Sequence, residues 1–248
     1  MAPAVPNCQQ KCEFCWRDLS YTQTQWEGEY DDPKTIIDEA VKAQNNLLCG
    51  FFGNDKANKE KLEESKTPTN AAISLAGEPM LYPKIDELIA EFNRRNFTTF
   101  VVSNGQCVDK LKNLENEPYQ LYLSLDAPTK KIYNDVCQPQ ISEGWDNLNQ
   151  SLDTLASFNS RTCIRTTCVK GRNMTNPEKY AELIKKASPD FVEIKAYMCV
   201  GSSRHRLTPD NMPTFDEVKS FAQKIGENCG KKIVNESANA LYALGCSD

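Results

Sequence analysis

Three cysteines near the start of the chain carry the clearest chemical signal. Cys8, Cys12 and Cys15 have the spacing C-x3-C-x2-C in the string CQQKCEFC. Thiolates this close in sequence can surround one soft metal centre, and iron–sulfur clusters are held by such thiolates. Three ligands instead of four would leave one iron free for a substrate. A zinc knuckle with a distant fourth ligand, or three unrelated thiols, are the alternatives, but zinc sites usually pair C-x2-C elements.

The other cysteines are scattered along the chain. There are 11 cysteines in all, an odd number. The start MAPAVPN is too short for a signal peptide, so a disulfide framework is not favoured and a cytoplasmic location is expected. Most of the scattered thiols are expected to be small buried hydrophobes. Five of them could in principle supply a further metal site, although their spacing does not suggest one: Cys49, Cys107, Cys137, Cys168 and Cys199.

Composition narrows the class of protein. The chain has 248 residues, a hydrophobic fraction of 40% and a charged fraction of 25%, which suit one ordered domain of α/β barrel type. Its mean hydropathy is −0.58, and no apolar run approaches the roughly 20 residues of a membrane-spanning helix. The net charge of −5 gives no global signal for nucleic acid, so any RNA site must be a local basic patch.

The elements that must position these residues alternate between strands and helices. We expect strands at residues 72–75, 98–102, 121–125, 164–169 and 191–196, and helices beginning at Pro33 and covering 85–92, 145–155, 177–186 and 215–225. Residues 54–70 are polar and indicate a solvated helix or loop. This alternation predicts a parallel sheet with right-handed crossovers, in five or six units that form an open partial barrel.

Polar residues directly follow the expected strands. Gly77-Glu78, Ser103-Asn104, Ser124 to Asp126, 165–170 and 195–206 all lie at such positions. Because functional sites in these folds lie at the carboxyl ends of the strands, we expect these segments to gather around one site.

The cysteine motif, with Phe14 before its last cysteine, resembles the signature of the radical S-adenosylmethionine (SAM) superfamily. The segment Ala76-Gly77-Glu78-Pro79 is similar to that superfamily's glycine-rich segment, with Ala-Gly in place of the usual double glycine. The resemblance implies a partial (β/α)6-type barrel in which three cysteines bind a [4Fe–4S] cluster and SAM binds the fourth iron. Cleavage of SAM then yields a 5′-deoxyadenosyl radical.

Longer strings resemble one member family, the tRNA 4-demethylwyosine synthases, and its archaeal form in particular. These strings are CWRD, GFFGN, SLAGEP, VSNG, LYLSLDAP, VEIKAYM and VGSSR, the last continuing to Asn211-Met212-Pro213. The resemblance covers about residues 4–221. We expect a single radical SAM domain over 1–248, with a core of about 4–200 and a family-specific extension of about 201–248.

The resemblance implies an enzyme that joins two carbons of pyruvate to 1-methylguanosine beside the anticodon of phenylalanine tRNA. The base must leave the anticodon-loop stack to reach the radical source. Cys8, Cys12 and Cys15 would then bind the cluster. The residues expected to bind SAM are Phe14 against the adenine, Gly77 and Glu78 at the methionine moiety, and Ser103, Asn104, Ser124 and Asp126 along its polar edge. Ser124 and Asp126 could alternatively be turn or helix-cap residues.

Basic residues complete the implied site. Arg165, Lys170, Arg204, His205 and Arg206 are candidates for binding tRNA phosphates, and the arginines and lysines of this region could also hold the pyruvate carboxylate. A solvated basic loop is the alternative. Lys195 and Lys56 are candidates for a Schiff base with pyruvate. The expected partners are the tRNA, pyruvate and an electron-donor protein. The enzyme is expected to be a monomer and not to associate with a membrane.

One feature of the archaeal family has no counterpart in this sequence. That family carries three further cysteines upstream of the radical motif, thought to bind a second iron–sulfur cluster, whereas seven residues precede Cys8 here. The competing interpretations are another radical SAM enzyme, such as a glycyl-radical activase, and a non-catalytic metal-binding RNA module.

Overall fold

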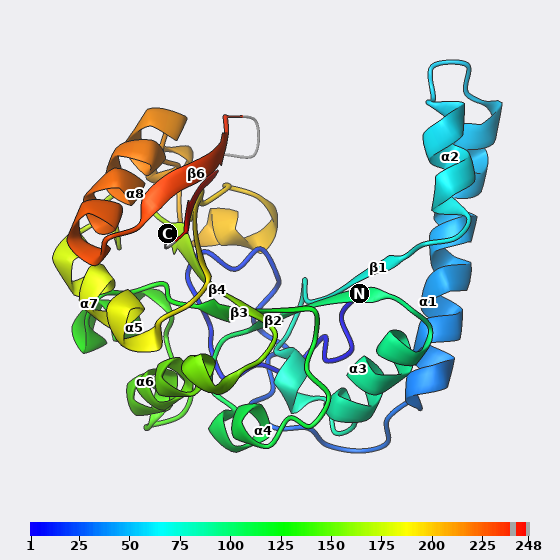
Figure 1. Cartoon of the computed structure of the whole chain (residues 1–248), viewed down its shortest axis with the longest axis horizontal. Helices are drawn as coiled ribbons and strands as arrows, with labels where there is room; N and C mark the ends of the chain where they lie inside the picture. The colour runs from blue at the N-terminus through cyan, green and yellow to red at the C-terminus, as the bar shows by residue number, and fades with distance from the viewer. Residues whose placement is uncertain (239–241, 247–248) are drawn as a thin grey trace.

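A computed structural model describes residues 1–238 and 242–246, and within them one sheet organises the chain. Its strand order is β1-β2-β3-β4-β5-β7-β6 (Figure 1). The first five strands are parallel: β1 (Asn70–Ile73), β2 (Thr98–Ser103), β3 (Gln120–Ser124), β4 (Arg161–Cys168) and β5 (Phe191–Ala196). An antiparallel hairpin, β6 (Lys232–Ser237) with β7 (Tyr242–Cys246), extends the edge at β5. The predicted α/β partial barrel is confirmed, with five parallel strands.

The expected strands and main helices are present. The helices are α1 (Pro33–Leu48), α2 (Lys59–Ser65), α3 (Ile85–Arg94), α4 (Val108–Lys112), α5 (Lys130–Val136), α6 (Gly144–Thr154), α7 (Pro177–Ala187) and α8 (Phe215–Cys229). Helix α1 begins at Pro33, as the sequence predicts, and Asp32 caps it by accepting from the Lys34 N–H. The sequence did not predict α4, α5 or the β6–β7 hairpin, because α4 and α5 are too short to show a period and β6 is mostly polar.

The helices lie along the outside of the sheet (Figure 1). Their buried apolar residues share one core with those of the strands. On α3, Leu88 and Ile89 are fully buried in the same core as Ile73 of β1 and Val101 of β2. Burial of each such side chain contributes about 1.5–3 kcal/mol relative to exposure. The sheet is thereby held rigid, which fixes the positions of its strand ends.

Strand register brings the predicted polar residues together. Ser103 pairs with Leu123, Ser124 with Arg165, and Thr167 with Lys195. Because the five strands are parallel, all of their carboxyl ends lie on the same side of the sheet, which we call its carboxyl edge.

The N-terminal loop, residues 1–31, crosses this edge. The Ser74 N–H donates to the Met1 carbonyl (2.9 Å) and the Glu78 N–H to the Asn7 carbonyl (2.7 Å), next to the end of β1. Further along, the Glu13 N–H donates to Val136 at the end of α5 (2.9 Å). The cysteine motif is therefore held over the carboxyl ends of the strands.

A helical arm formed by α1, the short helix η1 (Cys49–Gly53) and α2 projects from the sheet beyond β1 (Figure 1). Pro33 and Ile37 are the buried residues of α1, whereas Leu47 near its far end is 75% exposed. The polar segment 54–70 thus includes a solvated helix. None of the described helices is both long and apolar enough to cross a membrane.

Candidate active site

Cys8, Cys12 and Cys15 line one cavity of about 420 Å³ at the carboxyl edge of the sheet. All three are free, half-buried thiols. The Asn104 amide approaches the Cys8 sulfur at 3.6 Å, and the Cys12 thiol donates to the Gln10 Oε1 (3.4 Å). Burial, followed by the neighbouring Cys12, raises the pKa of Cys8 to about 12. A positively charged metal centre would stabilise the thiolate that this environment disfavours.

The three thiols suit an iron–sulfur cluster. Each cysteine of a [4Fe–4S] site binds a different iron, so three sulfurs can share one cluster without converging on a single point. The cysteine loop brings Cys8, Cys12 and Cys15 to one cavity, as such a cluster requires.

Gly77 allows the N-terminal loop to approach the end of β1. Its φ is +73°, and a Cβ there would lie 1.8 Å from the Ala4 carbonyl oxygen. The neighbouring Glu78 is 2% exposed and accepts from the backbone N–H groups of Asn104 (2.6 Å) and Met80 (3.0 Å). Burial raises the pKa of Glu78 to about 7. Its carboxylate therefore joins β1 to the end of β2 at the cavity wall.

The other predicted SAM-binding residues also line this cavity: Phe14, Ser103, Asn104, Ser124 and Asp126. Asp126 is buried and accepts from the Thr167 N–H (2.7 Å). Burial raises the pKa of Asp126 to about 6, against the opposing effects of this hydrogen bond and of the cationic Lys195 and Arg165. Asp126 is thus a wall residue tied to β4 and not a helix cap.

Two predicted basic residues, Arg165 and Lys195, contribute to the same wall. Arg165 donates to Glu193 through Nε (3.3 Å) and Nη2 (3.0 Å) and lies 4.4 Å from the Tyr122 ring centroid. Burial, followed by repulsion from Arg165, lowers the pKa of Lys195. The cavity thus contains an amine that loses its proton more readily than an exposed lysine.

Other predicted residues lie outside the cavity. Lys56 is exposed in the loop between η1 and α2, on the arm and away from the cavity wall. Lys170 forms an ion pair with Glu217 (2.6 Å), and Arg204 and His205 are exposed on η4 (Gly201–His205). Arg206 is half-buried and donates through Nε to the Glu13 carbonyl (3.0 Å), so its guanidinium faces the cysteine loop and not solvent.

The sequence did not single out the exposed apolar rim of the cavity. Trp16, Leu75, Met198 and Val200 line it and are 45%, 70%, 49% and 43% exposed. The Trp16 indole donates to the Leu75 carbonyl (3.3 Å), and Leu75 has a φ of +88°, which is rare for a bulky side chain. Apolar residues directly beside chemical motifs, as in Cys15-Trp16 and Leu75-Ala76-Gly77, are the signal that could have identified the rim.

Comparison with known families agrees with this geometry. The radical SAM superfamily matches residues 3–184, and the wyosine base formation family matches residues 186–244. The cysteine loop on a partial barrel defines a radical SAM protein, which implies a [4Fe–4S] cluster and SAM.

Individual relatives are more specific. The SAM-dependent tRNA 4-demethylwyosine synthase of Pyrococcus horikoshii is 47% identical over 229 residues, covering 91% of this chain and 67% of the relative. That of Methanocaldococcus jannaschii is 38% identical over 251 residues, covering 98% and 78%. A solved structure of TYW1 with a lysine–pyruvate adduct superposes with a TM-score of 0.89 at 37% identity, covering 99% of this chain and 78% of that one. The chain belongs to the tRNA 4-demethylwyosine synthase family.

Proposed function

We propose that this chain forms 4-demethylwyosine in tRNA by joining two carbons of pyruvate to 1-methylguanosine beside the anticodon of phenylalanine tRNA. The observation that carries the proposal is the cavity that combines the three cysteines, the Gly77 approach and the half-buried Lys195 beneath an open apolar rim. The wyosine-formation match over residues 186–244 favours this reaction over that of a glycyl-radical activase.

The cavity residues would bind and orient the cofactor. Cys8, Cys12 and Cys15 hold the cluster, which together with SAM supplies a carbon-centred radical able to abstract a hydrogen atom. Phe14 would pack against the adenine. Backbone groups at Gly77 and Glu78 would bind the methionine moiety, and the polar edge of SAM would face Ser103, Asn104, Ser124 and Asp126.

Lys195 is our candidate for the amine that binds pyruvate. It is the predicted Schiff-base lysine that lines the cavity, and burial lowers its pKa, which favours the neutral amine. A relative's structure carries a lysine–pyruvate adduct. Condensation of the amine with the pyruvate ketone forms an imine and releases water, while Arg165 is close enough in the wall to attract the carboxylate.

The apolar rim would receive the extruded base. Unstacked bases bind favourably to aromatic faces, and Trp16 offers such a face beside Leu75 at the cavity entrance. Arg204, His205 and Lys170 are exposed and are the candidate phosphate contacts. A tRNA substrate also supports a cytoplasmic enzyme, which we propose acts as a monomer with a separate electron donor.

The second cluster expected from the family stays an expectation for this chain. Of the thiols that could contribute to one, Cys137 and Cys168 are buried, Cys107 and Cys199 are half-buried, and Cys49 is exposed on the arm.

The test is reconstitution of the activity under anaerobic conditions. The protein would be given SAM, pyruvate, a reductant and tRNA containing 1-methylguanosine, and the tricyclic nucleoside would be sought by mass spectrometry. We expect it with the wild type and with Cys49→Ser, and not with Cys12→Ser. Formation of 5′-deoxyadenosine alone would contradict the proposed substrate while leaving the radical site intact. No SAM cleavage and no iron would favour the RNA-module alternative.

A further inference from the structure

The short helix η4 contacts the backbone of the cysteine motif. The Ser202 N–H donates to the Trp16 carbonyl (2.8 Å), and the Arg206 Nε donates to the Glu13 carbonyl (3.0 Å). The Arg206 Nη2 also donates to the Cys15 carbonyl. Three of the four carbonyls from Glu13 to Trp16 therefore accept hydrogen bonds from a segment almost 200 residues away in sequence.

Gly201 makes this approach possible. Its φ is +56°, and a Cβ there would lie 2.3 Å from the Trp16 carbonyl oxygen. Any other residue would force η4 away from the cysteine motif. The close approach of η4 to the cysteine motif therefore requires glycine at position 201.

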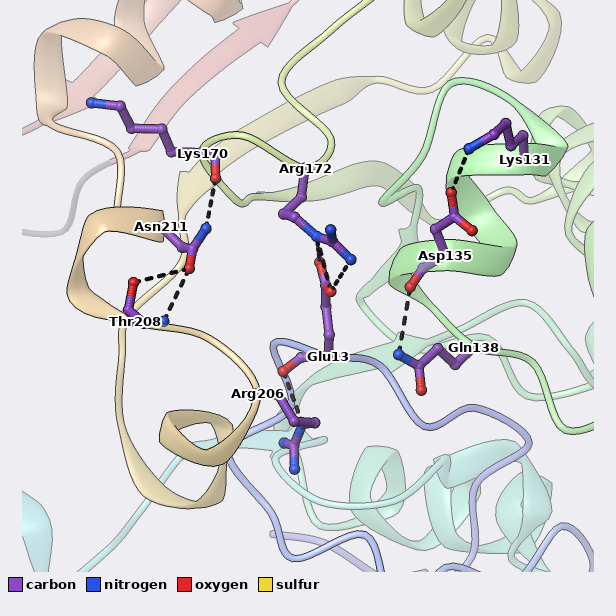
Figure 2. Close-up of polar contacts among 9 residues, drawn as sticks. All are labelled: Glu13, Lys131, Asp135, Gln138, Lys170, Arg172, Arg206, Thr208 and Asn211. Carbon is purple, nitrogen blue, oxygen red and sulfur yellow. Dashed lines mark hydrogen bonds and ion pairs between the residues drawn. The ribbon is translucent and has the colours of Figure 1, made fainter.

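Glu13 is fixed by Arg172 at its side chain as well as by Arg206 at its backbone carbonyl. Its buried carboxylate accepts from the Arg172 Nε (2.8 and 3.0 Å) and Nη2 (2.6 Å), while its carbonyl accepts from Arg206. Figure 2 shows Glu13 between these two arginines. The residue between the second and third cysteines is thus fixed at both its side chain and its backbone.

Arg206 itself is firmly supported. Its N–H donates to the Ser203 carbonyl (2.9 Å) at the end of η4. The buried Ser203 hydroxyl donates to the Val200 carbonyl (2.6 Å) and accepts from the Tyr197 hydroxyl (2.9 Å). A guanidinium on so constrained a helix can fix the loop that it contacts.

We propose that Arg206 is a positioning residue of the iron–sulfur site, which fastens the Glu13 and Cys15 carbonyls and places a positive charge beside the cluster. Residues around the ligands orient them, and the potential of an iron–sulfur cluster depends on nearby charge and hydrogen bonds. The cation stabilises the reduced, more negative cluster. Arg204 is a natural comparison, because it is exposed and its Nε donates to the Cys199 carbonyl (3.0 Å) and not to the cysteine motif.

The test compares Arg206→Gln, Arg206→Lys and the control Arg204→Gln by redox titration of the reconstituted cluster, followed by electron paramagnetic resonance. For Arg206→Gln we expect the one-electron reduction equilibrium to shift at least tenfold toward the oxidised cluster, which corresponds to about 59 mV. Arg206→Lys keeps the charge and should recover part of this shift. Arg204→Gln should leave the potential close to that of the wild type.

A second measurement covers a variant that fails to retain its cluster. In the cluster-free protein, the rate of alkylation of Cys8, Cys12 and Cys15 reports how firmly the loop is held, and the buried Cys163 reports global unfolding. We expect faster alkylation of the three motif cysteines in Arg206→Gln, with Cys163 unchanged. Equal potentials and equal alkylation rates in the wild type and Arg206→Gln would overturn the proposal. Neither measurement uses tRNA, so the result is independent of the proposed substrate.

Discussion

At the residue scale, the site depends on polar groups whose pKa values are displaced by burial. Glu78, Asp126 and Lys195 line one cavity, and burial is the largest cause of the shift in each. The shifts favour the neutral form of all three groups. Such clusters are typical of functional sites.

Glu78 should make stability depend on pH. Its pKa is raised from 4.5 to about 7, so its stabilising effect is present below pH 4.5 and is lost as pH rises through about 7. Relative to Glu78→Gln, the wild type should therefore lose up to about 3 kcal/mol of unfolding free energy between pH 4.5 and pH 8. Anaerobic urea unfolding at several pH values checks this, with the exposed Glu60→Gln as control. Parallel curves for wild type and Glu78→Gln would show that the carboxyl group titrates normally.

Lys195 should be trapped by pyruvate. Incubation with pyruvate and a borohydride reductant should convert the imine to a stable secondary amine on the peptide that contains Lys195. Peptide mass spectrometry locates the adduct, and Lys195→Arg should abolish it, while Lys56→Arg should not because Lys56 lies outside the cavity. An adduct on another lysine would remove Lys195 from the pyruvate site.

At the element scale, close backbone approaches hold the loops in place. Gly77 brings the N-terminal loop to the end of β1, and Gly201 brings η4 to the cysteine motif. The sequence predicted the regular elements well because α3, α7 and β5 show clear periods. It could not predict which loops touch, since such contacts join residues remote in sequence.

Gly77→Ala should distinguish the cost of a side chain at positive φ from the cost of displacing the N-terminal loop. A Cβ at Gly77 meets the Ala4 carbonyl at 1.8 Å, whereas Gly171, with a φ of +76°, has nothing within 4 Å. Both substitutions strain the backbone, but only the first also displaces the loop. We expect Gly77→Ala to cost about 1–3 kcal/mol more than Gly171→Ala. Urea unfolding and SAM-binding titrations check this, and equal costs would mean that the loop moves aside freely.

At the scale of the whole molecule, an acidic chain must bind an acidic RNA. The net charge is −5, so binding depends on local cations around the cavity. Several of the basic residues are already paired: Arg165 with Glu193, Lys170 with Glu217, and Arg172 with Glu13. Arg204 and His205 remain on the exposed surface of η4.

Charge reversal at Arg204 should weaken tRNA binding. We expect about a tenfold loss of affinity at low salt for Arg204→Glu, with a smaller slope of affinity against salt concentration, because one phosphate contact is lost. Cleavage of SAM should be retained. The control is Arg161→Glu, at the amino end of β4 on the opposite edge of the sheet. Filter binding at several salt concentrations checks this, and equal losses for both variants would indicate a general charge effect.

The sequence by itself determined the cysteine motif, the alternation of strands and helices, and the set of strand-end residues that line the cavity. These features depend on local spacing, which the chain carries directly. Tertiary structure alone placed Lys195 in the cavity wall and Lys56 outside it, brought the Arg206 guanidinium to the cysteine loop, and assembled the rim of Trp16, Leu75, Met198 and Val200. The physical reason is that a side chain's partners depend on packing between remote segments, which no local pattern specifies.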